Sequence, residues 1–169
     1  MTPEQAKFTA QFFVQGLENE FGITKKVIAA VPEAKKSYRP DEHARTAFEL
    51  ASHIASVDVW FLNGIAKGDL TPEGDKRFNT VAEIVAYYDR EFPAALAKIK
   101  AMPAEKLAQP LAAFGIFNFP AVAYLAFTNN HGIHHRGQLA TYLRPMGSKC
   151  PNIYGGSYDE PMQMPAGAH

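Results

Sequence analysis

The sequence predicts an all-α fold, a four-helix bundle, and three observations carry this prediction. Apolar residues recur at helical spacing in four long segments. Residues that favour helix starts stand at the beginning of these segments, and no segment shows a convincing strand pattern. The chain has 169 residues, 47% of them hydrophobic, so we expect one domain, residues 1–169, with a core of its own.

The first expected helix begins at Thr2-Pro3-Glu4 and ends at Pro32. Threonine is a fair N-cap, proline suits the first helical position, and glutamate favours the positive end of the helix dipole. A loop follows over residues 32–40. The apolar positions of this helix are Phe8, Phe12, Phe13, Leu17, Phe21, Val27 and Ile28.

The second helix is expected from about Asp41, its N-cap, to Ala66. Residues 67–79 contain a proline, two glycines and many charges, which indicates a loop. The third helix begins at Thr80, which forms a Thr-x-x-Glu capping box with Glu83 just ahead of an apolar run. Pro93 removes one backbone donor and is a candidate kink.

A connection over residues 102–119 is long for a bundle loop, and its apolar side chains indicate that it packs against the bundle. The fourth helix is expected from Pro120 to about Arg144. The remaining residues, rich in glycine and proline, predict an irregular tail laid across the bundle.

Composition excludes several classes of protein. The formal net charge is zero, which argues against a protein that grips nucleic acid through a basic surface. The longest apolar stretch, residues 114–127, is interrupted by Gly115, Asn118 and Pro120, so we expect no membrane span. The single cysteine, Cys150, excludes a disulfide within the chain. With no secretory signal at the N-terminus, these features predict a cytoplasmic protein.

Three of the six histidines fall within five residues of the fourth helix. His131 and His135 are four residues apart, so they share a helix face and point at one position. His134 lies near that face, on its other side. Burying imidazoles without partners is costly, and a metal ion removes this cost by accepting a lone pair from each ring. The pair therefore favours a metal site, although such pairs also arise by chance.

A third ligand should come from another helix, and His53, between Leu50 and Val57 on the second apolar stripe, is the natural candidate. A hydrogen-bonded core histidine is the alternative for His53. His43 stands among charged residues in a solvated setting, and His169 ends the chain.

The segment Asn130–Leu139, Asn-His-Gly-Ile-His-His-Arg-Gly-Gln-Leu, resembles the fourth-helix signature of the DinB-like superfamily. Residues 49–55 resemble its second-helix motif, and residues 147–161 resemble the tail of one bacterial branch. The resemblance implies an up-down-down-up bundle with a long crossover, a homodimer, and a metal held by His53, His131 and His135. His134 stands where the family commonly has another residue.

Superfamily members with assigned activity include bacterial low-molecular-weight thiol transferases and mycothiol-dependent maleylpyruvate isomerases. Three histidines suit Zn²⁺ or Ni²⁺ and leave a position open for a small-molecule substrate. The spacing also resembles His-Glu-x-x-His proteases, but Gly132 replaces their general base, which argues against that mechanism. The ion would instead hold a thiol as thiolate for attack on an electrophile. Cys150, in the tail, is not expected to be the nucleophile.

Three functions remain open from sequence. The first is a metal-dependent thiol transferase, the second is a metal-dependent hydrolase whose general base the sequence does not identify, and the third is a non-enzymatic metal-binding stress-response protein. Arg136 would meet a substrate carboxylate or serve as a surface or dimer residue. Asn130 and Gln138 would support the ligands or pack the helix. The aromatic side chains Trp60, Phe61 and Tyr142 are expected to line the core or the pocket wall.

Overall fold

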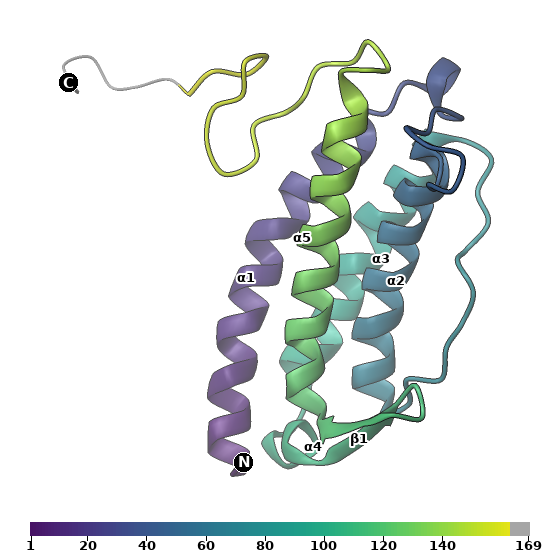
Figure 1. Ribbon diagram of the computed structural model, residues 1–169. Helices are drawn as coiled ribbons and strands as arrows, with labels where there is room; N and C mark the ends of the chain where they lie inside the picture. The colour runs from purple at the N-terminus through teal and green to yellow at the C-terminus, as the bar shows by residue number, and fades with distance from the viewer. Residues whose placement is uncertain (163–169) are drawn as a thin grey trace, which may run out of the picture.

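The computed structural model describes residues 1–162 and confirms the predicted all-α class, a bundle of four long helices (Figure 1). Helix α1 packs against α3 and α5, and α2 packs against the same two helices. Helices α1 and α5 run in one direction and α2 and α3 in the other, which is the up-down-down-up arrangement. The four are α1 (Pro3–Ala29), α2 (Ala47–Lys67), α3 (Val81–Ala101) and α5 (Tyr124–Leu143).

The long crossover is the connection between α2 and α3, residues 68–80. Because these two neighbouring helices are parallel, the connection runs the length of the bundle along its outside (Figure 1). Leu70 anchors its start in the core, where it is 2% exposed. The indole Nε1 of Trp60 donates to the carbonyl oxygen of Thr71 at 3.1 Å, which ties the loop to α2.

The N-terminal ends of the helices test the capping predictions. Thr2 caps α1 as expected, and its capping box is completed by Gln5. The expected start of α2 at Asp41 is wrong. Thr46 caps this helix instead, because its hydroxyl and the carboxylate of Glu49 form a reciprocal capping box there. Asp41 accepts a hydrogen bond from the backbone of His43 in the preceding turn.

Helix α3 begins where the sequence predicts, with Thr80 accepting from the backbone N–H of Glu83. The carboxylate of Glu83 accepts from the backbone of Asn79 and not from Thr80, so the predicted box is displaced by one residue. Pro93 lies inside α3, which continues through it from Val81 to Ala101.

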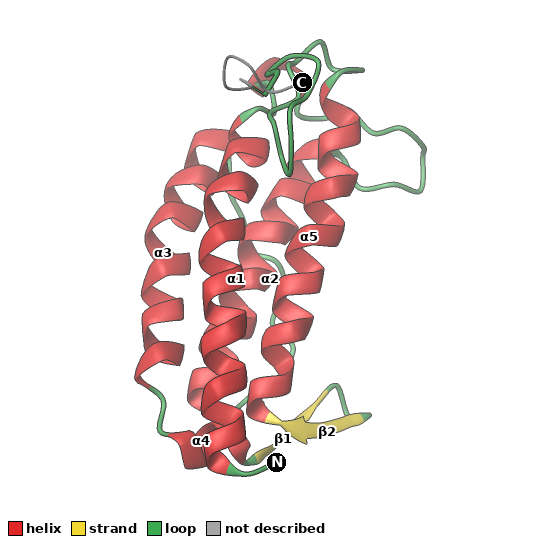
Figure 2. Ribbon diagram, turned by 90° about the vertical axis from the view of Figure 1, so that its left-hand side faces the viewer, coloured by secondary structure: helices red, strands yellow, loops and turns green. Residues whose placement is uncertain are grey.

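The prediction that the chain lacks strands is wrong for the connection between α3 and α5. This connection holds a short helix, α4 (Ala104–Ala108), and an antiparallel hairpin of β1 (Pro110–Ala113) and β2 (Phe117–Pro120). Strands of four residues are too short for an alternating pattern to be recognised. The hairpin crosses one end of the bundle (Figure 2) and packs against it as expected, with Leu111 and Ala113 buried.

Helix α5 begins at Tyr124, later than predicted, because Pro120 ends β2 and a 3₁₀ turn, Ala121–Ala123, intervenes. Residues 148–162 contain no helix or strand, in agreement with the predicted irregular tail. Ser148 attaches this tail to α1 by donating to the carbonyl oxygen of Ala30 at 2.6 Å. The rest of the predicted tail, including His169, lies outside the described residues.

No helix within residues 1–162 combines the length and the apolar character that a membrane crossing requires.

Candidate metal centre

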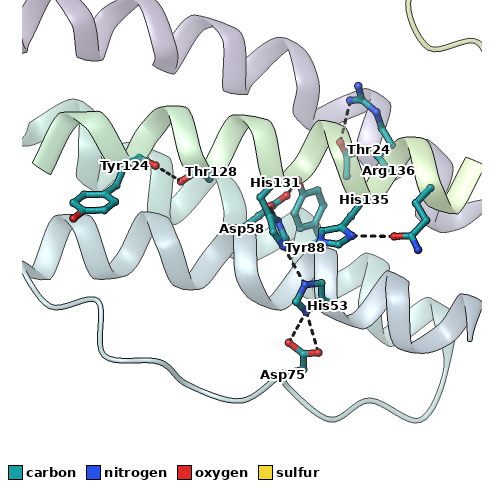
Figure 3. Close-up of polar contacts among 11 residues, drawn as sticks. Thr24, His53, Asp58, Asp75, Tyr88, Tyr124, Thr128, His131, His135 and Arg136 are labelled. Carbon is teal, nitrogen blue, oxygen red and sulfur yellow. Dashed lines mark hydrogen bonds and ion pairs between the residues drawn. The ribbon is translucent and has the colours of Figure 1, made fainter. Parts of the chain in front are cut away.

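The structure brings the three predicted histidines together between two neighbouring helices (Figure 3). Helix α2 contributes His53, and α5 contributes His131 and His135, one turn apart. One ring nitrogen from each lies within 4.8 Å of the other two. Nε2 of His53 and Nε2 of His131 are 3.2 Å apart. We call these residues the three-histidine cluster.

Each ring of the cluster has its other nitrogen engaged by an oxygen acceptor. Nδ1 of His131 lies 2.8 Å from Oδ1 of Asp58, and Nδ1 of His53 lies 3.0 Å from Oδ1 of Asp75. Nδ1 of His135 lies 3.1 Å from Oε1 of Gln138. A carboxylate or amide oxygen accepts only, so Nδ1–H donates in each contact. Each Nε2 is thereby left as an unprotonated lone-pair donor, which is the form that binds a metal.

The donor geometry fits a tetrahedral divalent ion. Nε2 of His53 and Nε2 of His131 face one another at 3.2 Å, so a cation bound between them would accept a lone pair from each neutral ring. Two ligands each about 2.0–2.1 Å from zinc at the tetrahedral angle are roughly 3.3–3.4 Å apart. The spacing of His53 and His131 is close to that value, and His135 supplies a third nitrogen. Zinc and nickel both accept such a set, so the donors do not distinguish between them.

Asp58 is the most deeply buried of the acceptors, at 3% exposed. Its Oδ2 accepts a hydrogen bond from the hydroxyl of Tyr88, on α3, at 3.1 Å. Burial, aided by the nearby carboxylate, raises the pKa of Tyr88 well above its ordinary value, so the hydroxyl keeps its proton. Asp58 therefore orients His131 and is itself positioned by Tyr88. Carboxylates that orient metal-binding histidines are commonly hydrogen-bonded in this way.

Gly132 explains how Asp58 reaches α5. A Cβ atom at this position would come within 3.1 Å of Oδ2 of Asp58, closer than ordinary contact. The glycine that replaces the protease general base thus makes room for a carboxylate from the neighbouring helix.

Burial also sets the charge of the cluster. Desolvation lowers the pKa of His135 from its ordinary 6.5 to about 4. Desolvation lowers the pKa of His53 as well, although the hydrogen bond that its Nδ1–H donates to Asp75 acts in the opposite direction. Both rings are consequently neutral near pH 7, and protons compete weakly with a metal for these two sites.

A pocket of about 570 Å³ opens beside the cluster, and His53 and His131 form part of its wall. Aromatic rings from α2, the hairpin and α5 line most of the remainder, and the crossover loop closes one side. The charged residues at the pocket are Arg45, Glu73 and Asp75. Its aromatic residues are Trp60, Phe61, Phe114, Phe117 and Phe127.

The other residues considered from sequence fall in different places. His134 is exposed and belongs to no ligand cluster among the described residues, and His43 is also exposed. The interpretation of Arg136 as a surface residue, or as a residue that binds the carboxylate of a substrate, is wrong. It is 1% exposed and forms an ion pair with Glu20. Cys150 lies in the tail, outside the pocket lining.

Of the aromatic residues considered, Trp60 and Phe61 line the pocket, and Tyr142 lies in the core. Asn130 is exposed, whereas Gln138 contacts the cluster.

Sequence reasoning missed Asp58 and Asp75. Asp58 left one signal: it is a lone carboxylate within the apolar stretch of α2, and a buried carboxylate requires a partner. Asp75 left none, because it lies in a loop with several other charges.

Comparison with known proteins supports the fold. YjoA of Bacillus subtilis is 26% identical over 127 residues, which make up 74% of this chain and 82% of that protein. Its crystal structure superposes with a TM-score of 0.70 at 23% identity, covering 84% of this chain and 96% of that one. A DinB-like protein from Bacillus cereus superposes with a TM-score of 0.72 at 23% identity, covering 84% and 95%.

The family comparison extends over nearly the whole chain. Residues 6–165 match the DinB family. This span includes α2, α3, α5, nearly all of α1 and the three-histidine cluster. From this match, together with the bundle topology, we conclude that the chain belongs to the DinB family.

Proposed function

We propose that this protein is a metal-dependent transferase that moves a low-molecular-weight thiol onto an electrophile. His53, His131 and His135 would hold one divalent ion, zinc or nickel. The observation that carries the proposal is the convergence of three lone-pair donors, each fixed through its Nδ1, beside an aromatic pocket. When bound, the ion would supply Lewis acidity that favours the thiolate form of a thiol at neutral pH.

The protein's own groups would orient the reactants. Asp58, Asp75 and Gln138 fix the direction in which each imidazole presents its lone pair. The pocket would bind the electrophile by burying its apolar part and would limit access of water to the reacting atoms. With three protein ligands, one position of a tetrahedral ion stays open to substrate.

The small thiols used by family members with assigned activity support the choice of a transferase. A hydrolase is the second candidate, and one observation favours it: the carboxylate residue Glu73 lines the same pocket as His53 and His131. A carboxylate near the site would serve as the general base that such a mechanism needs. The third candidate function is a metal-binding protein without catalytic activity.

Metal content tests the site directly. We expect about one zinc or nickel ion per chain by elemental analysis of the purified protein, and loss of this ion in His131→Ala. His134→Ala is the matched control on the same helix and should retain the ion. Absence of metal in the native protein, with no uptake on titration of Zn²⁺ or Ni²⁺, would exclude the site.

An activity screen tests the reaction. The metal-loaded protein is assayed with bacillithiol, mycothiol, glutathione and cysteine against an electrophilic dye, with His131→Ala as the inactive control. Thiol-dependent turnover supports the transferase. Turnover without any thiol, lost in Glu73→Gln, would favour the hydrolase. No turnover, with a thermal midpoint that falls on metal removal, would favour the non-catalytic protein.

A further inference from the structure

The tip of the β-hairpin contains an unusual backbone conformation. Phe114 has φ 57° and the next residue, Gly115, has φ 70°. The amide of Ile116 donates to the carbonyl oxygen of Ala113 at 3.2 Å and closes the turn. Two successive positive φ values are typical of a type I′ turn, whose first central position favours Asn, Asp or Gly. Phenylalanine there is a genuine outlier, because a bulky side chain strains the backbone in this region.

Burial does not account for this residue, because Phe114 remains 42% exposed. The ring is directed into the aromatic pocket, with its centroid 5.9 Å from that of Trp60 and 6.3 Å from that of Phe61. Ile116, two residues along, is 77% exposed and is not part of the pocket. The strained position therefore carries the one side chain of the turn that faces the pocket.

The hairpin is held firmly enough to maintain this placement. Ala113 pairs with Leu70 of the crossover loop through an isolated parallel bridge. The same loop is fixed to α2 by the hydrogen bond from Trp60 to Thr71. The hairpin and the crossover loop, which both line the pocket, are thus joined to each other and to the helix that carries His53.

The charged side chains at the pocket differ in whether another residue of the protein already pairs with them. Asp75 is engaged by His53. The guanidinium of Arg45 lines the same pocket as His53, lies near the carboxylate of Glu49, and forms no ion pair within residues 1–162. Glu73 is the opposing charge, on the crossover loop. Arg45 is therefore placed to receive an anionic group from a ligand whose apolar part occupies the aromatic pocket.

We propose that this pocket binds a carboxylate that carries a planar aromatic ring, with the ring against Phe114 and Trp60 and the carboxylate at Arg45. The proposal rests on the proposed function and deepens it, since it names the class of small molecule that the pocket beside the three-histidine cluster would take. Phe114 acts as a specificity residue, and the strain at its backbone is maintained because its ring completes the ligand site.

Binding is measured on metal-free protein, so the result does not depend on metal uptake or turnover. Trp60 is the only tryptophan of the chain and lines the pocket, which makes its fluorescence a local reporter. The probes are 3-phenylpropionate, its uncharged amide and hexanoate. We expect 3-phenylpropionate to bind about threefold or more tightly than either of the others. Equal binding of the three, or no binding, would overturn the proposal.

Variants test the two proposed contacts of the ligand, that of its carboxylate with Arg45 and that of its ring with Phe114. Arg45→Gln should remove the preference for the carboxylate over the amide. Phe114→Asn should weaken 3-phenylpropionate about fivefold or more while preserving the turn, since asparagine suits a left-handed position. Phe114→Tyr should retain affinity, and Ile116→Asn is the matched control that should leave it unchanged. If Phe114→Asn and Ile116→Asn bind like the native protein, the role of Phe114 is excluded. Failure of metal uptake would remove the metal-dependent functions proposed above and leave the ligand pocket to be judged by these binding data.

Discussion

Gly132 of α5 lies against the carboxylate of Asp58 on α2, between the two helices that carry the three-histidine cluster. A Cβ atom on Gly132 would lie 3.1 Å from Oδ2 of Asp58, whose Oδ1 is 2.8 Å from Nδ1 of His131. The absence of a side chain at Gly132 therefore leaves room for the carboxylate that orients His131, one residue earlier on α5.

Gly132→Ala should disturb that arrangement by displacing the Asp58 carboxylate. We expect metal affinity to fall about tenfold or more, the usual effect of losing an outer acceptor. Affinity is measured by competition with a chelator of known strength.

Gly137→Ala is the control, because a Cβ there meets nothing within 4 Å. It should keep native affinity and raise the free energy of unfolding by up to about 1 kcal/mol, since alanine favours the helix. Equal metal affinity in both variants would contradict the role of Gly132.

Acid should destabilise the metal-free protein through His53 and His135. The folded pKa of His135 is lowered to about 4 and that of His53 is also lowered, both chiefly by burial. Above pH 6.5 these rings are neutral in both states and contribute nothing. As pH falls from 6.5 towards 4, the unfolded chain binds protons that the folded chain does not, so stability is lost. The measurement is the thermal midpoint against pH in the presence of chelator.

His135→Gln should flatten that dependence, because the substituted side chain does not titrate. A variant whose midpoint falls with acid as steeply as that of the native protein would show that other groups are responsible.

Arg136→Met should destabilise the fold without affecting the metal. Arg136 is 1% exposed, pairs with Glu20, and donates to the hydroxyl of Tyr154 at 2.6 Å, so its loss leaves a carboxylate without its charge partner. We expect a loss of about 3 kcal/mol in urea unfolding.

Arg144→Met is the matched control, because Arg144 is 56% exposed and pairs with Asp159 at the surface. Its loss should cost at most about 1 kcal/mol. Similar losses in the two variants would mean that burial does not strengthen the Arg136 contact.

The homodimer implied by the family resemblance remains a prediction, and α1 offers a surface for it. Phe8 and Phe12 are 74% and 72% exposed and lie one turn apart on the same helix face. The double variant Phe8→Ser, Phe12→Ser should therefore shift the mass measured by light scattering from dimer to monomer.

Tyr158→Ser is the control, since Tyr158 is 91% exposed in the tail. A native protein that is monomeric at high concentration, or a double variant that remains dimeric, would contradict the assignment of this surface.

The sequence determined the features that depend on neighbours along the chain. Helical periodicity, the Thr2 and Thr80 caps and the shared face of His131 and His135 follow from helix geometry within a few residues. The start of α2 was missed at this same level, since Thr46 and Glu49 compete with Asp41 as the cap.

Only the tertiary structure decided which side chains from separate elements meet. The order of the helices places His53 against the pair on α5, and the crossover loop and the interior of α2 supply Asp75 and Asp58. Such contacts depend on how helices pack and where loops return, which periodicity along one helix does not encode. The sequence thus indicated a ligand pair and, through the family resemblance, His53 as its third member, whereas packing produced the observed arrangement of the three rings, its acceptors and the pocket beside it.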